Sequence, residues 1–234
     1  MSPALARLRA FVRRRFSREG AVGLSFTVGF LTCAFLVVLF GALAVEVLEE
    51  ERLSALDRQV TLAVRGYHAP GLDRFVRAVS FLGGLAFVLP ATLAVCGVLA
   101  LRRRRVCAIL FAGSVWGGLA VNSLLKLSYV RARPYLWEAL VTESTHSFPS
   151  GHAAMATAFF GGLAAVVFHV TRRPWARLLA VLGSAGAIGA IAGSRVYLGA
   201  HWLTDVAAGI LLGLFWVVVA ATGTEFFARR ADMT

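Results

Sequence analysis

The sequence has few charged residues, few cysteines and almost no lysine. Only 15% of its 234 residues are charged, whereas 59% are hydrophobic, and the mean hydropathy is +0.75. Soluble domains are about 45–50% apolar, so this composition excludes an ordinary soluble domain. The three cysteines, Cys33, Cys96 and Cys107, all lie in long apolar runs, and they show neither a disulfide framework nor metal-ligand spacing. No internal repeat or low-complexity linker divides the chain, and we expect one domain over residues 1–234.

What the sequence has instead is six long uncharged runs. They cover residues 21–45, 78–101, 106–125, 153–171, 178–194 and 206–224. Each is about long enough to cross a hydrocarbon core of ~30 Å as a helix. The first run is too long for a signal-peptide core, and VEVLEEE follows it instead of a cleavage site of small residues. We therefore predict an all-α protein, a bundle of six transmembrane helices over residues 21–224.

The segment between the first two runs, residues 46–77, has helical spacing on both sides of a break. H-A-P-G at 68–71 is the break. The apolar positions before and after it are Leu53, Leu56, Val60, Ala63/Val64, and then Leu72, Phe75, Val76 and Val79. We expect a pair of short amphipathic helices lying on the outer membrane surface. The alternative is a packed cap with no role in substrate binding.

Arginine placement predicts the orientation in the membrane. With the N-terminus inside, the inside segments are 1–20, 102–105, 172–177 and 225–234. They carry six, four, three and two arginines, fifteen in all, against three acidic residues. Because cytoplasmic loops are rich in basic residues, we expect both termini in the cytoplasm of a plasma (inner) membrane protein. Contact with anionic lipid headgroups accounts for the net charge of +12, so no nucleic-acid partner is needed.

Ionisable groups gather at the predicted outer ends of the third to sixth runs. They are Lys126, Arg131, Arg133, Glu138, Glu143, His146, His152, Arg195, His201 and Asp205. A bundle would bring Lys126, Arg133 and Arg195 to one depth, where the cations would repel one another unless an anion lay among them. A phosphate suits this set, because arginine pairs with its oxygens bidentately and lysine adds a point charge.

Two further patterns indicate phosphate chemistry. In P-S-G-H (149–152), Pro149 and Ser150 suit a helix start, whose unpaired N–H groups form an anion site. Gly151 would let the backbone approach a ligand, and His152 would stand within reach of it. His201 and Asp205 are four residues apart and would share a helix face. The carboxylate could then orient the imidazole as a nucleophile. Each pattern alone is also compatible with a purely structural role.

Together the three patterns are K-x6-R-P (126–134), P-S-G-H (149–152) and S-R-x5-H-x3-D (194–205). In order and in spacing they resemble the signatures of the type 2 phosphatidic acid phosphatase superfamily, the lipid phosphate phosphatases. The resemblance covers about 80 residues closely. It implies that phosphate is bound by Lys126, Arg133, Ser150, the Gly151 amide and Arg195. It also implies that His201 attacks phosphorus, Asp205 orienting it, and that His152 protonates the leaving oxygen.

The resemblance further implies a phosphohistidine that water hydrolyses, with His152 then acting as the base. The cations would stabilise the phosphoryl charge, so no metal or cofactor is expected. Ser194 has a less clear role, for which a hydrogen bond at a helix end is the simple alternative. His146, His68 and His169 lie outside the signatures, and we expect them to be non-catalytic.

Three alternatives remain at this point. A lipid phosphotransferase would use the same residues, with a second hydroxyl in place of water. Vanadium-dependent haloperoxidases resemble the same signatures but are soluble. A transporter would carry polar groups near mid-membrane, where only Asn122 and Ser123 of the third run are suitable. We expect a lipid phosphate substrate, such as phosphatidate, phosphatidylglycerol phosphate or undecaprenyl pyrophosphate, and an active site facing the periplasm or cell exterior. The sequence does not indicate an oligomeric state.

Overall fold

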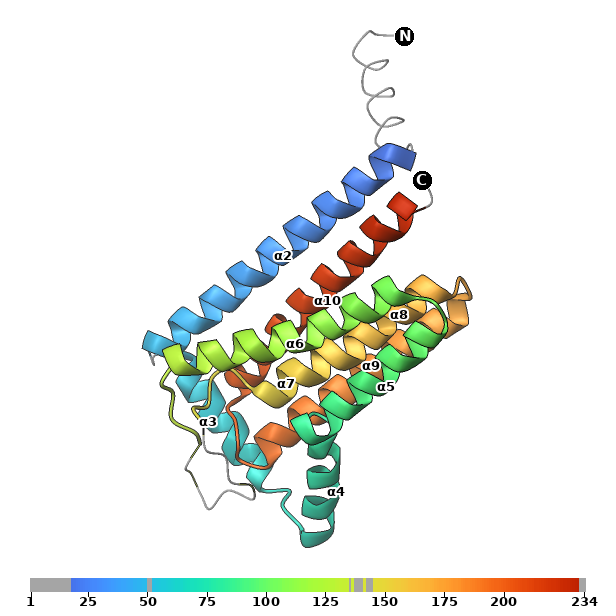
Figure 1. Ribbon diagram of the computed structural model, residues 1–234. Helices are drawn as coiled ribbons and strands as arrows, with labels where there is room; N and C mark the ends of the chain where they lie inside the picture. The colour runs from blue at the N-terminus through green and yellow to red at the C-terminus, as the bar shows by residue number, and fades with distance from the viewer. Residues whose placement is uncertain (1–17, 50–51, 135, 137–140, 142–144, 232–234) are drawn as a thin grey trace, which may run out of the picture.

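The computed structural model describes residues 18–49, 52–134, 136, 141 and 145–231, and over these residues it is helical with no strand (Figure 1). The predicted all-α class is therefore confirmed. The helices are α2 (Arg18–Glu49), α3 (Arg52–Arg65), α4 (Pro70–Phe81), α5 (Leu85–Leu101), α6 (Arg105–Ser128), α7 (Gly151–Ala156), α8 (Gly162–Val170), α9 (Pro174–Tyr197) and α10 (Leu203–Ala231). A π-helical turn, η1 (Thr157–Gly161), joins α7 to α8 in one continuous helical segment.

Five helical segments are long and apolar enough to cross a membrane. They are Leu24–Glu49, Arg105–Ser128, Gly151–Val170, Pro174–Tyr197 and Leu203–Phe227. The bent pair α4 and α5 would make a sixth span if the two are counted together. The prediction of one continuous helix over 78–101 is wrong, because α4 and α5 meet at 43°. Gly83 and Gly84 lie in the turn between them, and glycine is a poor helix former. The count of six spans stays a prediction.

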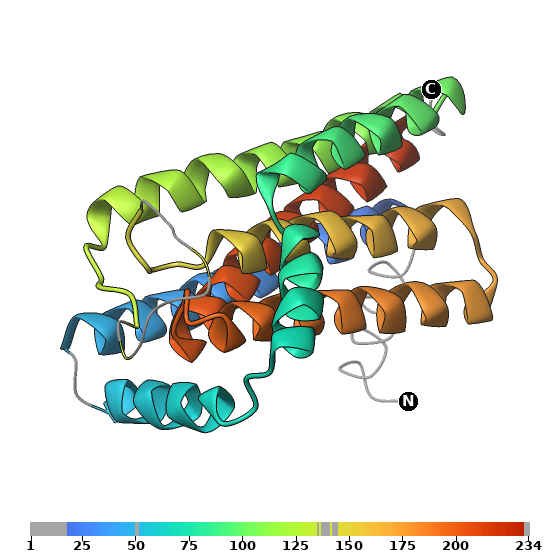
Figure 2. The same cartoon turned by 90° about the horizontal axis from the view of Figure 1, so that it is seen from below.

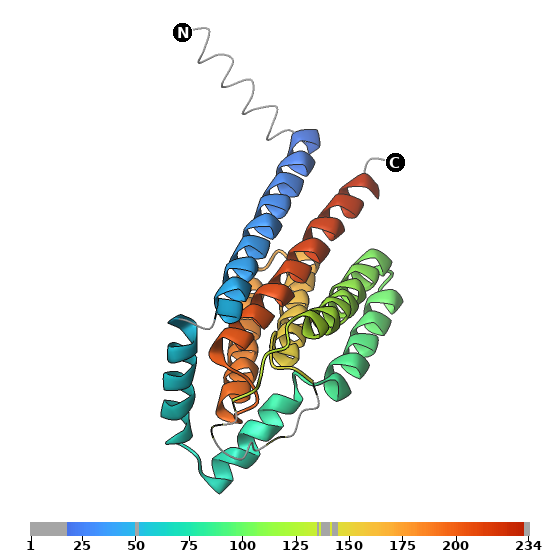
Figure 3. The ribbon, with the colours of Figure 1, turned by 90° about the vertical axis from the view of Figure 1, so that its left-hand side faces the viewer.

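The helices run between two ends of the molecule, and the turns alternate between these ends (Figures 1 and 3). The first turn of α2, the last turn of α10 and the arginine-rich α5–α6 and α8–α9 turns lie at one end. The C-terminus of α6, the start of α7 and the turn from α9 to α10 lie at the other, together with α3 and α4. Of the predicted basic segment 1–20, residues 1–17 lie outside the described residues, as do 232–234 at the other terminus.

The core at the centre of the bundle is formed by side chains of α5, α6, α7 and η1. Val88, Phe111, Val115, Met155 and Phe159 form one buried apolar cluster. Close approach of α10 to α7 depends on glycine. A Cβ on Gly209 would lie 2.5 Å from the Ser150 carbonyl oxygen, and one on Gly213 would lie 2.4 Å from Thr157 Cβ. These contacts fix the start of α10 against the start of α7. By contrast, α2 exposes large apolar side chains, as expected of a surface in contact with lipid.

The helix α3 lies alongside the bundle at the end that holds the start of α7 (Figures 1 and 2). Val60 and Val64 pack on a cluster formed by Ala153, Ala192, Val196 and Val206. The buried face of α3 also holds Asp57 and Thr61, which are 1% and 0% exposed. Leu56, which the sequence placed on one apolar face with Val60, is 44% exposed. The face of α3 that packs on the bundle thus includes Asp57 and not Leu56, and α3 packs as a cap. Contact of α3 or α4 with a membrane surface stays a prediction.

Candidate active site

The centre of the site is His201, which precedes α10 and is 1% exposed. Its Nδ1 lies 3.5 Å from Asp205 Oδ2, and its Nε2 lies 3.3 Å from Nη1 of Arg133. The sequence predicted the His201–Asp205 pair from helical spacing, and that reason is wrong because α10 begins only at Leu203. The loop folds His201 back over the first turn of the helix, which brings the two side chains together by a different route.

The neighbours of His201 define its tautomer. A guanidinium can only donate hydrogen bonds, so Nε2 must offer its lone pair to Arg133. The proton of the neutral ring is then on Nδ1, facing the carboxylate of Asp205. Burial together with the charges of Arg195 and Arg133, opposed by Asp205, lowers the pKa of His201 from 6.5 to about 4. At neutral pH the ring is therefore uncharged, and Nε2 is unprotonated with its lone pair toward Arg133, as a nucleophile requires.

Asp205 is fully buried and is surrounded by donors. Its Oδ1 accepts from Nη1 of Arg131 at 2.5 Å. Its Oδ2 accepts from the Trp202 N–H at 2.9 Å and from the Ser147 hydroxyl. The carboxylate is thus held as an ion in one orientation, with Oδ2 turned toward His201. Neither Arg131 nor Ser147 was assigned a role from the sequence.

Lys126 and Arg133 meet at the segment that precedes P-S-G-H. Lys126 Nζ donates to the His146 carbonyl at 2.6 Å and to Thr145 Oγ1 at 3.3 Å. Nη2 of Arg133 donates to the same two oxygens at 3.2 and 3.4 Å. Arg133 also donates to the carbonyls of Thr145 and Ala200. The structure thus brings together two of the three cations predicted to converge, while the third, Arg195, donates to Ser80. His146 contributes its carbonyl to this cluster.

The P-S-G-H residues open α7 as predicted. Ser150 is the N-cap of the helix, and its Oγ accepts from the Ala153 N–H. The Ser150 N–H donates to the Asp205 carbonyl at 2.9 Å, which ties this turn to the start of α10. Packing also favours glycine at position 151, because a Cβ there would lie 3.2 Å from Nδ2 of the buried Asn122. Asn122 thus belongs to the site end of the bundle, while Ser123 bonds within its own helix.

The last turn of α4 and the turn that follows it support Arg195 and His152. The Nε2 atom of His152 lies 3.4 Å from where a Cβ on Gly84 would stand, and a Cβ on Gly83 would lie 3.0 Å from the His152 carbonyl. Arg195, 2% exposed, donates to Ser80 Oγ at 2.8 Å. The sequence gave no signal for Ser80. Ser194 bonds to the carbonyl of Ile191 in its own helix, the simple alternative named above.

Asp57, which lies outside the signatures, extends the site toward α3. Asp57 accepts from Nη2 of Arg131 at 2.8 Å and from the Thr204 N–H at 3.0 Å. A signal was present in the sequence, because Asp57 follows Leu53 by four residues and precedes Val60 by three, which places a charge on an apolar helix face. Glu138 and Glu143 lie outside the described residues.

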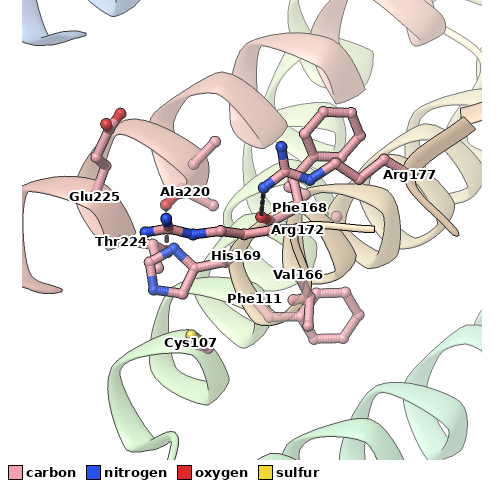
Figure 4. A pocket seen from close by; sticks show the side chains of 13 residues that line it. Cys107, Phe111, Val166, Phe168, His169, Arg172, Arg177, Ala220, Thr224 and Glu225 are labelled. Atoms are coloured by element: carbon pink, nitrogen blue, oxygen red, sulfur yellow. Dashed lines mark hydrogen bonds between the residues drawn. The ribbon is translucent and has the colours of Figure 1, made fainter. Parts of the chain in front are cut away.

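A separate cavity lies at the opposite end of the bundle, where α8 ends and α9 begins (Figure 4). It has a volume of about 810 Å³ and is lined among others by His169, Arg172, Arg177 and Glu225. None of the signature residues lines it. Because the signature residues lie elsewhere, we do not assign phosphate chemistry to this cavity.

The comparison with protein families places the signatures in context. The model of the PAP2 superfamily matches residues 105–228 of this chain, from the start of α6 into α10. The chain belongs to the PAP2 superfamily. The family expected from the three signatures is thereby confirmed, and with it the predicted enzyme class, a phosphatase. The region of α2 to α5 lies before the matched residues.

Individual relatives agree with this membership. Phosphatidylglycerophosphatase B of Bacillus subtilis strain 168 is 29% identical over 181 residues, which are 75% of this chain and 87% of that protein. The crystal structure of a transmembrane PAP2 type phosphatidylglycerolphosphate phosphatase from Bacillus subtilis has a TM-score of 0.72 and 25% identity, covering 86% of this chain and 96% of its own. LpxE of Aquifex aeolicus, at 24% identity and a TM-score of 0.56, covers 70% of this chain and 94% of its own, and it shares the fold.

Proposed function

We propose that this PAP2 phosphatase hydrolyses the phosphate ester of a membrane lipid through a phosphohistidine at His201. The observation that carries the proposal is the buried imidazole with a carboxylate on one nitrogen and a guanidinium on the other. The carboxylate stabilises the cation that forms as Nε2 bonds to phosphorus. The guanidinium lies where it can bind an oxygen of the transferred group.

The remaining signature residues complete the reaction. Lys126, Arg133 and Arg195 bind the phosphoryl oxygens together with Ser150 and the Gly151 amide at the start of α7. Phosphate oxygens then replace the carbonyls of residues 145 and 146 as acceptors for Lys126 and Arg133. His201 forms the P–N bond while the P–O bond to the lipid breaks, and His152 gives its proton to the departing alkoxide. Water then attacks the phosphohistidine, and His152 takes a proton from it.

Location supports a lipid substrate. Five to six apolar spans surround a site at one end of the bundle, at the depth where a lipid would present its headgroup. The arginine-rich turns lie at the other end, which favours a site on the periplasmic or outer face with both termini in the cytoplasm. The two Bacillus subtilis relatives act on phosphatidylglycerol phosphate by name, so this lipid is the first of the candidate substrates to test.

A phosphate-release panel tests the proposal. Purified protein in detergent is given phosphatidylglycerol phosphate, phosphatidate or undecaprenyl pyrophosphate, each with and without EDTA. We expect release from at least one lipid that persists in EDTA and is lost in His201→Ala. Release that is equal in His201→Ala, or that chelation abolishes and magnesium restores, would contradict the proposed mechanism.

A further inference from the structure

A buried carboxylate from outside the signatures accepts hydrogen bonds from residues at the candidate site. Asp57 lies on α3, before the residues that the family model matches, and is 1% exposed. Its Oδ2 accepts from Nη2 of Arg131 at 2.8 Å and from Thr204 Oγ1 at 2.5 Å. Its Oδ1 accepts from the Thr204 N–H at 3.0 Å. Among the described residues, the side-chain hydrogen bonds of Asp57 thus lead to Thr204 in the first turn of α10 and to Arg131, the arginine that binds Asp205.

Arg131 joins two buried carboxylates. Nη2 faces Asp57, and Nη1 faces Asp205 Oδ1 at 2.5 Å and Thr204 Oγ1 at 2.8 Å. The side chains of Asp57, Arg131 and Asp205 are 1%, 15% and 0% exposed. One guanidinium between two carboxylates leaves the group with one net negative charge in a place that water barely reaches, where charges interact strongly.

That negative charge matches what His201 becomes during the reaction. The imidazole is neutral before attack and carries a positive charge once Nε2 has bonded to phosphorus. With Asp57 ionised, the group next to His201 keeps one unit of negative charge to stabilise this cation. Without it, Arg131 would neutralise Asp205 completely, and the cation would face a group of zero net charge. The interaction is therefore stronger in the transition state than in the ground state, as catalysis requires.

We propose that Asp57 is a positioning residue for phosphoryl transfer, which acts through Arg131 and Thr204 to fix Asp205 and to keep its charge available to His201. The inference rests on the proposed function, because it assumes that His201 is the nucleophile. It gives α3 a role in the reaction as well as in covering the bundle. Replacing a buried ionic group by apolar residues is often neutral or stabilising, so stability alone does not account for a charged network here.

The experiment measures the rate constant of the first chemical step, not total activity. The enzyme is mixed in detergent micelles with a smaller amount of ³²P-labelled phosphatidylglycerol phosphate, or of the lipid that the release panel selects. The reaction is then quenched at successive times. A fraction of misfolded protein would leave the rate constant at saturating enzyme unchanged. We expect Asp57→Asn to lower this rate constant about 10–100-fold, by analogy with the loss of an outer-shell partner of a metal-binding histidine. The enzyme concentration at half-saturation should stay the same.

Thr61→Val is the matched control. Thr61 lies one turn from Asp57 on the same buried face, and its hydroxyl has no hydrogen-bond partner among the described residues. It should keep the rate constant of the unmodified protein. If Asp57→Asn does not purify as folded protein, Asp57→Ser carries the same test, since it also removes the charge and leaves room for water beside Arg131.

Asp205→Asn separates this inference from the proposed function. In that background the loss of Asp57 should slow the step by less than about 3-fold, because the charge that Asp57 protects is already gone. An Asp205→Asn variant as fast as the unmodified protein would overturn the proposed function. A slow Asp205→Asn combined with a fast Asp57→Asn would overturn only the role of Asp57. Equal loss from Asp57→Asn in both backgrounds would also overturn it, since the two residues would then act independently.

Discussion

The substitution Asp205→Asn should be unusually damaging for so small a change. Arg131 donates to Oδ1, while the Trp202 N–H and the Ser147 hydroxyl donate to Oδ2, and His201 Nδ1 lies 3.5 Å from Oδ2. Whichever way the new amide is turned, its NH₂ group faces a donor. The variant therefore loses the negative charge and gains a donor–donor contact in a buried place. Loss of the orienting carboxylate costs about 10⁴-fold in kcat in serine protease triads, and we expect a loss of at least that order here.

The assay is release of phosphate from lipid micelles under saturating substrate, with the folded fraction measured by gel filtration. The chain offers a matched control in Asp73, which lies 3.6 Å from His68 Nδ1 and accepts from Tyr197 Oη at 2.7 Å. Asp73→Asn alters a second His–Asp pair away from the signatures and should keep kcat within about 3-fold. A folded Asp205→Asn protein that keeps kcat within 10-fold of the unmodified protein would refute the role given to Asp205.

Three further results are expected. Gly83→Ala should destabilise the protein by about 1–3 kcal/mol, because its Cβ would lie 2.5 Å from a side-chain carbon; Gly97→Ala, where the described residues leave open space, should not lower the melting temperature. In a cysteine-free background, Tyr67→Cys should react with an impermeant thiol reagent on intact cells and Arg102→Cys should not; reversed labelling would place the site in the cytoplasm. The pKa of His201 is about 4 when folded and 6.5 ordinarily, so stability should fall by up to about 3 kcal/mol as the pH drops from 6.5 to 4. The stability of His201→Gln should not show this fall. The same pH dependence of the melting temperature in His201→Gln and in the unmodified protein would contradict the prediction.

Much of the helical fold, and a candidate phosphate site, could be predicted from the sequence for physical reasons. A helix that crosses a membrane must be apolar along its whole length, so most spans were visible as uncharged runs. The chemistry of phosphoryl transfer restricts residue types and local spacing, so Lys126, Arg133, Ser150, His201 and Asp205 could be proposed from the sequence through its resemblance to the family signatures. Even so, the spacing of His201 and Asp205 led to the correct pair through the wrong geometry, because a loop and not a helix turn joins them.

The parts that the sequence did not predict depend on contacts between distant segments. Asp57 and Arg131 are 74 residues apart, and so are Arg131 and Asp205. Ser80 lies 115 residues from Arg195. Nothing in local periodicity links such pairs. The break in the predicted second span does not show in the hydropathy, because Leu82, Gly83 and Gly84 are apolar or neutral. Two poor helix formers and the packing of Gly83 against α7 and α9 together account for the turn.

The most direct test of the account is the identity of the phosphorylated residue. Protein incubated briefly with ³²P-labelled lipid phosphate is denatured in alkali, which preserves phosphohistidine, and digested for peptide mapping by mass spectrometry. The account predicts an acid-labile, alkali-stable phosphate on His201, increased in His152→Ala because water attack then lacks its base, and absent from His201→Ala. A phosphate on any other residue, or turnover by His201→Ala at the rate of the unmodified protein, would contradict the assignment of His201 as the nucleophile.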